Sequence, residues 1–355
     1  MEELARFLLT FAVGFAVGFV LHRLKVPGGM LVGAIIGTAA LNILFDAAFV
    51  PSQAKVLAQI FAGAFIGSSV QRSDLHRLRQ IYKPAAILLG MYLALNLLLG
   101  FLIFSVSELS LATAFFSAVP GGISDIPLIA ADMGANAPQV AVMQFVRLVV
   151  GIAIFPGVIN ALCKEPEPCI NEAAFDGTAG PTAPAPSKRK RVVVLLATLS
   201  AAIAFGLVGA WLKIPAGALL FALIAVIILK LSWGQTYFPI WIRRIVQVLS
   251  GAYIGRSFGL GDLLALRHLV WPAVILVAGY SANCFFSGWM LRRFCGMSRK
   301  ESMLAATPAG ASDMALISLD MGVQSADLVV LQVLRLVVVS SIFPQIIHLV
   351  LLLAG

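Results

Sequence analysis

Long apolar segments separated by short polar stretches dominate this sequence. In the first half, six such segments lie near 5–22, 29–45, 54–70, 84–107, 111–133 and 138–162. The stretches 84–107, 192–212 and 269–291 contain no charged side chain at all. A helix needs about 20 mostly apolar residues to cross the hydrocarbon core of a bilayer, which is about 30 Å thick. The pattern therefore predicts an all-α polytopic membrane protein with about 10–12 helical segments, whose first partner is the lipid bilayer.

The composition excludes an ordinary soluble fold. The chain has 355 residues, of which 60% are hydrophobic and only 12% are charged. Soluble domains average about 25% charged residues. The net charge of +9 comes largely from clusters in short loops. Membrane proteins keep such basic loops on the cytoplasmic side, so this charge does not indicate nucleic-acid binding.

The chain is a tandem repeat with one constant offset. The motif Pro120-Gly121-Gly122-Ile123-Ser124-Asp125 returns as Pro308-Ala309-Gly310-Ala311-Ser312-Asp313, and Arg147 returns as Arg335. The differences 313 − 125 and 335 − 147 both equal 188, so no gap is needed between the halves. We expect a first membrane repeat over 1–163, a flexible linker with a basic end over 164–191, and a second repeat over 192–355.

Small residues in a small-xxx-small pattern also repeat, and they most often indicate close helix packing. They are Gly63, Gly67, Gly251 and Gly255.

The basic loops bear on how the two halves face the membrane. These loops are 71–83, 188–191 and 292–300. If only five segments of each half cross, all three loops lie on one side, and the halves are inverted. If all six cross, the first loop is separated from the other two, and the halves are parallel. The positive-inside tendency favours inversion, with the basic loops on the cytoplasmic side. The segment 111–133 would then be the broken or re-entrant one.

Charged side chains inside spans are the candidate functional groups, because burying a charge in lipid is costly. Each half carries two aspartates and an arginine, accompanied by a glutamine. The candidate substrate- or ion-binding residues are Asp125, Asp132, Gln144 and Arg147, then Asp313, Asp320, Gln332 and Arg335, with Ser124 and Ser312 beside them. The expected helix break consists of Pro120, Gly121 and Gly122, repeated at Pro308 and Gly310.

The local pattern suggests how these groups are arranged. A Pro-Gly-Gly break ends one helix, and Ser124 could cap a new half-helix with Asp125 in its first turn. Gln144 and Arg147 are three residues apart and so share a helix face, which we expect to look toward the two acids. Two alternatives remain open. Each arginine could simply neutralise an aspartate as a structural ion pair, and Asp132 and Asp320 could sit at helix ends near the headgroups.

At the repeated Pro-[Gly/Ala]-Gly-x-Ser-Asp and Asp-Met-Gly…Gln-x-x-Arg-Leu motifs, the chain resembles the bacterial membrane AbrB family, whose members carry this duplication twice. Members are labelled regulators of gene expression or ammonia monooxygenases. The resemblance thus implies a multi-pass location in a bacterial cytoplasmic (inner) membrane and a regulatory or an enzymatic role. The residues themselves support neither label, since they show no helix-turn-helix pattern and no cluster of metal ligands.

Three functions follow as hypotheses. The first is an ion- or proton-coupled secondary transporter of a small polar or anionic solute, in which the aspartates bind Na⁺ or carry H⁺. The second is a membrane-embedded sensor that regulates gene expression through a partner. The third, a membrane enzyme, is disfavoured. We expect no direct nucleic-acid contact, no metal and no resident cofactor, and we leave a homo-oligomer open.

Overall fold

The computed structural model is helical throughout the part of the chain that it describes. That part is residues 2–354 without 72–73, 75–76, 78–79, 163–187, 309–313, 315–316, 319–320, 322 and 324. The helices of the first half are α1 (Glu2–Arg23), α2 (Gly29–Phe45), α3 (Ser52–Ser69), α5 (Tyr82–Val106), α6 (Leu111–Ser117), α7 (Ile126–Asp132), α8 (Ala137–Ala153) and α9 (Phe155–Leu162). Those of the second half are α10 (Lys188–Trp211), α11 (Gly217–Trp233), α12 (Ile240–Gly255), α13 (Leu260–Ala265) with the 3₁₀ turn η2 (Leu266–Leu269), α14 (Val270–Cys295), α15 (Arg299–Ala305), α17 (Ala326–Ser341) and α18 (Phe343–Ala354).

The long helices that the structure describes in both halves match at the offset found in the sequence. Adding 188 to the bounds of α2 gives those of α11, and adding 188 to the bounds of α6 gives those of α15. Among the residues that the structure describes, six helices are long and apolar enough to cross a membrane, including α1, α5, α10 and the α13–α14 unit. The protein is therefore a multi-pass membrane protein built as a structural repeat, as predicted.

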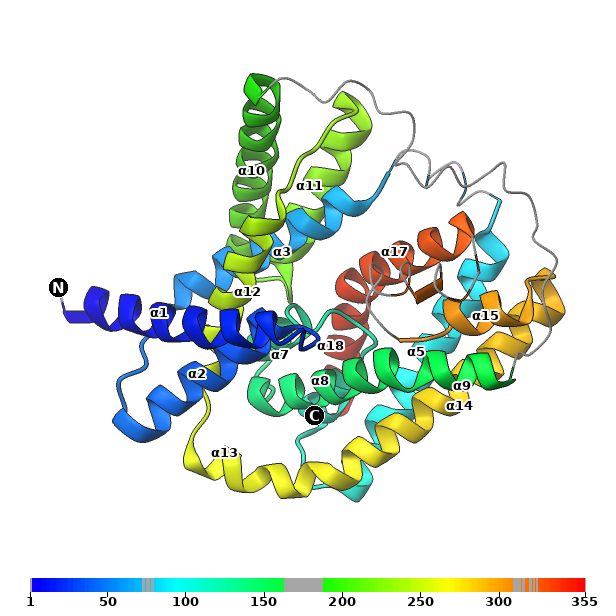
Figure 1. Ribbon diagram of the computed structural model, residues 1–355, viewed down its shortest axis with the longest axis horizontal. Coiled ribbons are helices and arrows are strands. Elements are labelled where there is room, and N and C mark those ends of the chain that lie inside the picture. Colours follow the sequence, from blue (N-terminus) through cyan, green and yellow to red (C-terminus); the bar gives the residue numbers. More distant parts are fainter. Residues whose placement is uncertain are drawn as a thin grey trace.

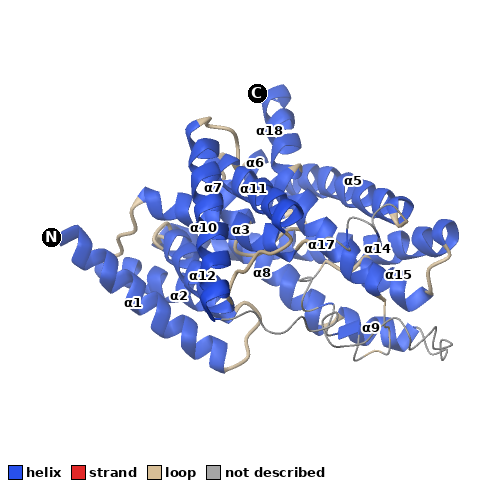
Figure 2. Cartoon of the chain, turned by 90° about the horizontal axis from the view of Figure 1, so that it is seen from above, coloured by secondary structure: helices blue, strands red, loops and turns tan. Residues whose placement is uncertain are grey.

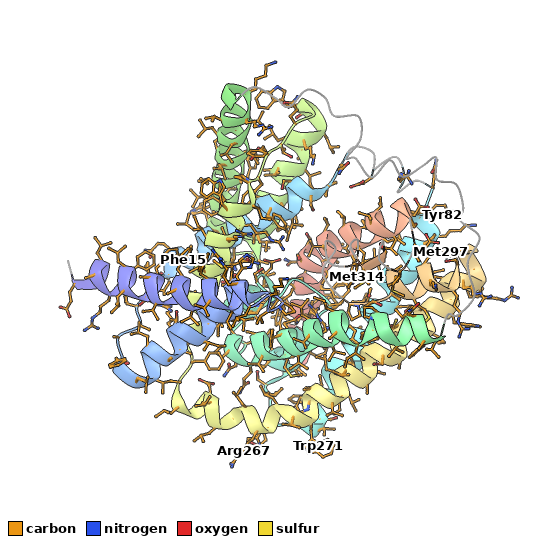
Figure 3. The ribbon with its side chains drawn as sticks, viewed as in Figure 1. Phe15, Tyr82, Arg267, Trp271, Met297 and Met314 are labelled. Carbon is orange, nitrogen blue, oxygen red and sulfur yellow. The ribbon has the colours of Figure 1, made fainter. Side chains whose placement is uncertain are left out.

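Each half contributes to both of two helical bodies. The helices α1–α3 and α10–α12 pack on one another and form what we call the scaffold bundle. The remaining described helices form the core bundle, which consists of α5–α9, α13–α15, α17 and α18. Contacts between the two bodies are sparse. The scaffold bundle lies to the left and the core bundle to the right in Figure 1, and Figure 2 shows the same division from above. Trp271 points outward from the edge of the molecule in Figure 3, where lipid would surround it, and Phe15 on α1 is also exposed.

Glycines let the third helix of each half pack directly on the second helix of the other half. A Cβ added to Gly63 would lie 2.3 Å from the carbonyl oxygen of Leu219, and one added to Gly251 would lie 2.6 Å from that of Leu31. The pairs are equivalent under the offset, so the two halves are interlocked about a pseudo-two-fold axis. The predicted role of these glycines in close packing is confirmed.

The same contacts fix the relative direction of the halves. Gly67 meets Leu223 just as Gly63 meets Leu219, so α3 runs parallel to α11. The loop 46–51 can reach at most about 20 Å, which is too short to let α3 run parallel to α2. Helices α2 and α11 therefore run in opposite directions. The halves are inverted, as the basic loops predicted.

The fifth segment of the first half is a re-entrant hairpin. It consists of two seven-residue helices, α6 and α7, on either side of an irregular stretch. The amide of Asn136, just beyond α7, donates to the hydroxyl of Thr113 at the start of α6 (3.0 Å). Asp132 at the end of α7 forms an ion pair with Lys55 near the start of α3. Both ends of the segment thus lie at one face, which leaves five crossings in this half.

The basic end of the predicted linker belongs to a helix instead. Helix α10 begins at Lys188, so the four basic residues 188–191 form its first turn rather than the end of a flexible linker. Lysine and arginine are good helix formers, and they extend the apolar helix past its hydrophobic segment. The rest of the predicted linker, up to residue 187, lies outside the described residues.

Candidate functional site

The tip of the first hairpin is a stretch of irregular backbone that contains the predicted break. Helix α6 ends at Ser117 and α7 begins at Ile126, with Pro120, Gly121 and Gly122 between them. The carbonyl of Gly122 accepts from the amides of both Asp125 (3.3 Å) and Ile126 (3.1 Å). This turn makes Asp125 the N-cap residue of α7, so the prediction that Ser124 caps the helix is wrong.

Gln144 and Arg147 on α8 hydrogen-bond to the backbone of this tip. The side-chain amide of Gln144 donates to the carbonyls of Phe116 (2.9 Å) and Val119 (3.0 Å). The guanidinium of Arg147 donates to the carbonyls of Val119 (2.9 Å) and Gly121. The last carbonyls of a helix lack partners within it and carry its negative dipole end, so an arginine here satisfies and neutralises them.

The second half repeats these hydrogen bonds. Gln332 on α17 donates to the carbonyls of Leu304 (3.1 Å) and Ala305 (3.2 Å), and Arg335 donates to that of Thr307 (2.8 Å). Gln144 also donates to the carbonyl of Ser117 (3.4 Å). Each second-half partner therefore lies 188 residues from its equivalent in the first half, since 304 − 116, 305 − 117 and 307 − 119 all give 188. The geometry is thus a property of the repeat.

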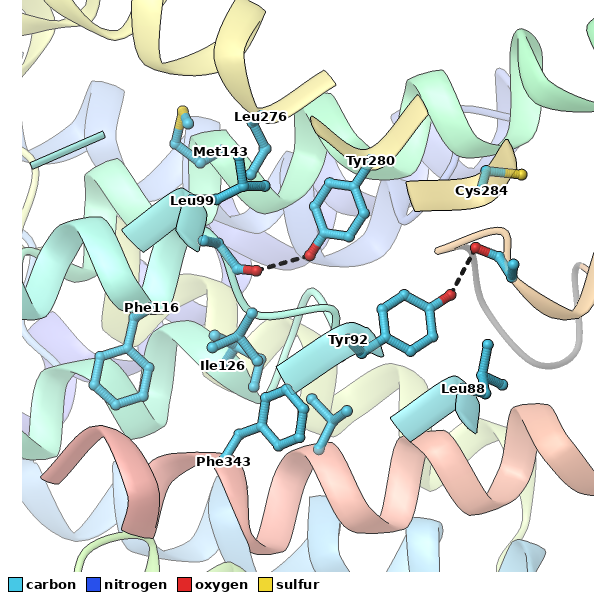
Figure 4. Close-up of a cluster of buried hydrophobic side chains, with 14 of the residues drawn as sticks. Leu88, Tyr92, Leu99, Phe116, Ile126, Met143, Leu276, Tyr280, Cys284 and Phe343 are labelled. Atoms are coloured by element: carbon cyan, nitrogen blue, oxygen red, sulfur yellow. Dashed lines mark hydrogen bonds between the residues drawn. The ribbon is translucent and has the colours of Figure 1, made fainter. Parts of the chain in front are cut away.

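Two tyrosines join the halves at the tips. The hydroxyl of Tyr280 donates to the carbonyl of Ala118, and that of Tyr92 donates to the carbonyl of Ala306, both at 2.8 Å. Figure 4 shows the two bonds as dashed lines. The Arg335 guanidinium also lies 3.4 Å from the Tyr92 hydroxyl oxygen. Each tip is therefore held by an arginine of its own half and a tyrosine of the other half.

The prediction that Gln144 and Arg147 face the two acids is wrong for the first half. Asp132 is paired with Lys55, and it also accepts from Gln59 (2.5 Å). Asp125 is buried, its carboxylate hydrogen-bonds to Ser124, and it forms no ion pair with a described residue. The structural ion-pair alternative is likewise wrong for Arg147, whose guanidinium bonds to carbonyl oxygens rather than to a carboxylate of the described chain.

The remaining predicted residues can be placed only in part. Pro308 is buried next to Thr307, at the position equivalent to Pro120. Gly310, Ser312, Asp313 and Asp320 lie outside the described residues. The hydrogen bonds of Gln332 and Arg335 match those of Gln144 and Arg147. The structure therefore brings together the glutamines, the arginines and the first break, and it separates Asp132 from them.

Sequence reasoning missed the tyrosines and the lysine partner of Asp132. Tyr92 and Tyr280 are identical residues at the repeat offset within apolar spans, so a search for repeated polar groups would have found them. Lys55 is a charge inside the predicted span 54–70, and the cost of burying charge could have singled it out.

Comparison with known proteins assigns the chain to a family. The AbrB family profile, described as "Transition state regulatory protein AbrB", matches residues 1–163 and 84–351, so the chain belongs to this family. It is 25% identical over 362 residues to "Uncharacterized protein YhjN" of Bacillus subtilis (strain 168), covering 97% of this chain and 92% of the relative. It is 26% identical over 328 residues to "Putative regulator AbrB" of Escherichia coli (strain K12), covering 90% and 89%.

Proposed function

We propose that the protein is a secondary transporter of a small anionic solute in the bacterial cytoplasmic membrane. The observation that carries the proposal is the repeated set of hydrogen bonds from glutamine, arginine and tyrosine side chains to the backbone after α6 and α15. There, groups from two inverted halves meet across a pseudo-two-fold axis. Broken helices in matching positions of inverted repeats are where transporters place their substrate and coupling-ion sites. The sparse contacts between scaffold and core bundles also suit the relative movement that alternating access requires.

The charges at the tips favour an anion. Arg147 and Arg335 are both almost fully buried and lie within electrostatic range of each other. Buried charge is costly unless it is compensated, and the two carbonyl dipoles that Arg147 contacts compensate its guanidinium less fully than a carboxylate would. Gln144 keeps its buried side-chain oxygen without a partner among the described residues, as does Gln332. A solute with a carboxylate and a hydroxyl or ammonium group would satisfy both the guanidinium and the glutamine oxygens.

Asp125 is the proposed coupling residue. It is a buried carboxylate at a hairpin tip, hydrogen-bonded to Ser124 and within electrostatic range of the Arg243 guanidinium on α12. A carboxylate in such a place either holds a proton or binds a cation such as Na⁺. Asp313 would do the same in the second half, because the sequence repeats it.

Transport should be tested with purified protein in liposomes, by recording solute-induced currents under an imposed H⁺ or Na⁺ gradient. The probes are acetate, lactate, succinate and citrate. We expect at least one probe to give a gradient-dependent current, which the double variant Asp125→Asn/Asp313→Asn loses. The matched control is Asp46→Asn. Asp46 is an exposed loop residue in a left-handed backbone conformation, and asparagine tolerates that conformation. If the double variant kept its gradient-dependent current, the proposed coupling role of these aspartates would be contradicted.

A regulatory function is the alternative, because one relative is named a regulator. A sensor would act through a partner docked on the segment between the halves. Deletion of residues 165–187 separates the hypotheses. A transporter should keep its current after the deletion, whereas a sensor should lose its effect on transcript levels while the membrane fold persists.

A further inference from the structure

A cavity separate from the hairpin tips lies between the scaffold and core bundles. Its volume is about 620 Å³, within the range of small-molecule sites. On the scaffold side its wall comes from the start of α3, the end of α10 and the turn before α11. On the core side it comes from the ends of α7 and α18. The residues that the argument uses are Lys55, Asp132, Lys213, Ile214, His348 and Leu352.

The wall of this cavity carries an excess of positive charge. Asp132 is the only acid among its described lining residues, and Lys55 neutralises it in an ion pair. Lys213 and His348 then remain, and neither side chain forms a hydrogen bond or an ion pair with any described residue. An imidazole can donate a hydrogen bond to an oxyanion beside the lysine.

The surroundings show which kind of ligand the cavity suits. Ile214 and Leu352 make part of the wall apolar. Leu352 is also 66% exposed, and Trp211 beside the cavity is 79% exposed. Tryptophans gather where a bilayer meets water. Because the ends of α7, α10 and α18 meet here, the cavity opens at one membrane face, near headgroup depth.

We propose that this cavity binds a single oxyanion, a phosphate or carboxylate group, between Lys213 and His348. The group can come from an anionic lipid headgroup or from a small free anion, since both present the same chemistry. The proposal does not depend on transport, because the cavity and its charges stand apart from the hairpin tips.

The test compares thermal stability of the purified full-length protein in phosphatidylcholine nanodiscs. One arm adds phosphatidylglycerol to the nanodisc, and the other adds inorganic phosphate or succinate to the buffer. We expect one arm to raise the melting temperature of the wild type. The variant Lys213→Ala/His348→Ala should lose that rise, with apparent affinity falling about fivefold per basic side chain.

The control variant is Lys25→Ala, which removes one positive charge at the position of the first half equivalent to Lys213. Both lysines are exposed and have a positive φ, 58° and 52°, so the local backbone is matched. A response in the lipid arm identifies a headgroup, and a response in the buffer arm identifies a free anion. The proposal is overturned if neither arm stabilises the wild type, or if Lys25→Ala weakens the response as much as the double variant does.

Discussion

Arg147 shows how one residue can be both structural and available for binding. Its guanidinium has five N–H donors in a planar fork, and two carbonyl oxygens at the hairpin tip accept from it. These bonds hold irregular backbone at membrane depth, which is tolerated only when its polar groups are satisfied. Because the partners are carbonyls, the positive charge is not cancelled by an ion pair, and it can still attract an anion.

The variant Arg147→Lys separates the two roles. Lysine keeps the charge but is a point donor that cannot bridge Val119 and Gly121. Each lost hydrogen bond to a charged group costs about 1.5–3 kcal/mol, so local opening of the tip should rise tenfold or more. Hydrogen exchange of residues 118–126, followed by mass spectrometry, checks this, with the exposed Arg6→Lys as the control. Unchanged exchange would mean that Arg147 does not hold the tip.

At this scale the sequence singled out polar residues that the structure places at the hairpin tip, but it did not predict what they touch. The repeat and the rarity of intramembrane charge singled out Gln144, Arg147 and Asp125. The sequence could not show that Arg147 bonds to carbonyls rather than to an aspartate, because hydrogen bonds to the backbone depend on where the hairpin turns. Nor could it show that Tyr92 reaches Ala306, a contact between residues 214 positions apart.

Among the elements, the interlock of α3 with α11 rests on glycine. Membrane helices gain no hydrophobic driving force from packing together in lipid, so close van der Waals contact must supply much of the association. A Cβ at Gly63 would lie 2.3 Å from a backbone oxygen of α11, which cannot move without shifting the helix. The helix extents themselves were predicted to within a few residues, because apolar length and the Pro-Gly break set them.

Replacing Gly63 by alanine should therefore destabilise the scaffold bundle by about 1–3 kcal/mol, the usual range for overpacking. Gly90 on α5 provides the control, because a Cβ there has no neighbour within 4 Å. Gly90→Ala should be neutral or slightly stabilising. Melting temperatures in detergent compare the two. Equal effects of the two substitutions would argue against a tight α3–α11 contact.

For the whole molecule, inversion decides which surfaces share a side of the membrane. The ion pair of Lys55 with Asp132 places the end of α7 at the face where α3 begins, so the segment 111–133 does not cross. Five crossings remain in the first half. An odd number of crossings puts the loops near Arg77, Lys190 and Arg299 on one side. It also puts Lys213, at the cavity between the two bodies, on the opposite side.

Cysteine accessibility tests this arrangement in a background that lacks the four native cysteines. Single cysteines at Arg77, Lys190 and Arg299 should react with a membrane-impermeant reagent only from the cytoplasmic side, since basic loops stay there. A cysteine at Lys213 should react only from the other side. If Arg77 instead labels opposite to Lys190 and Arg299, six segments cross per half and the halves are parallel. Inverted halves present equivalent surfaces to opposite sides of the membrane, which is the symmetry that alternating access of one central site requires.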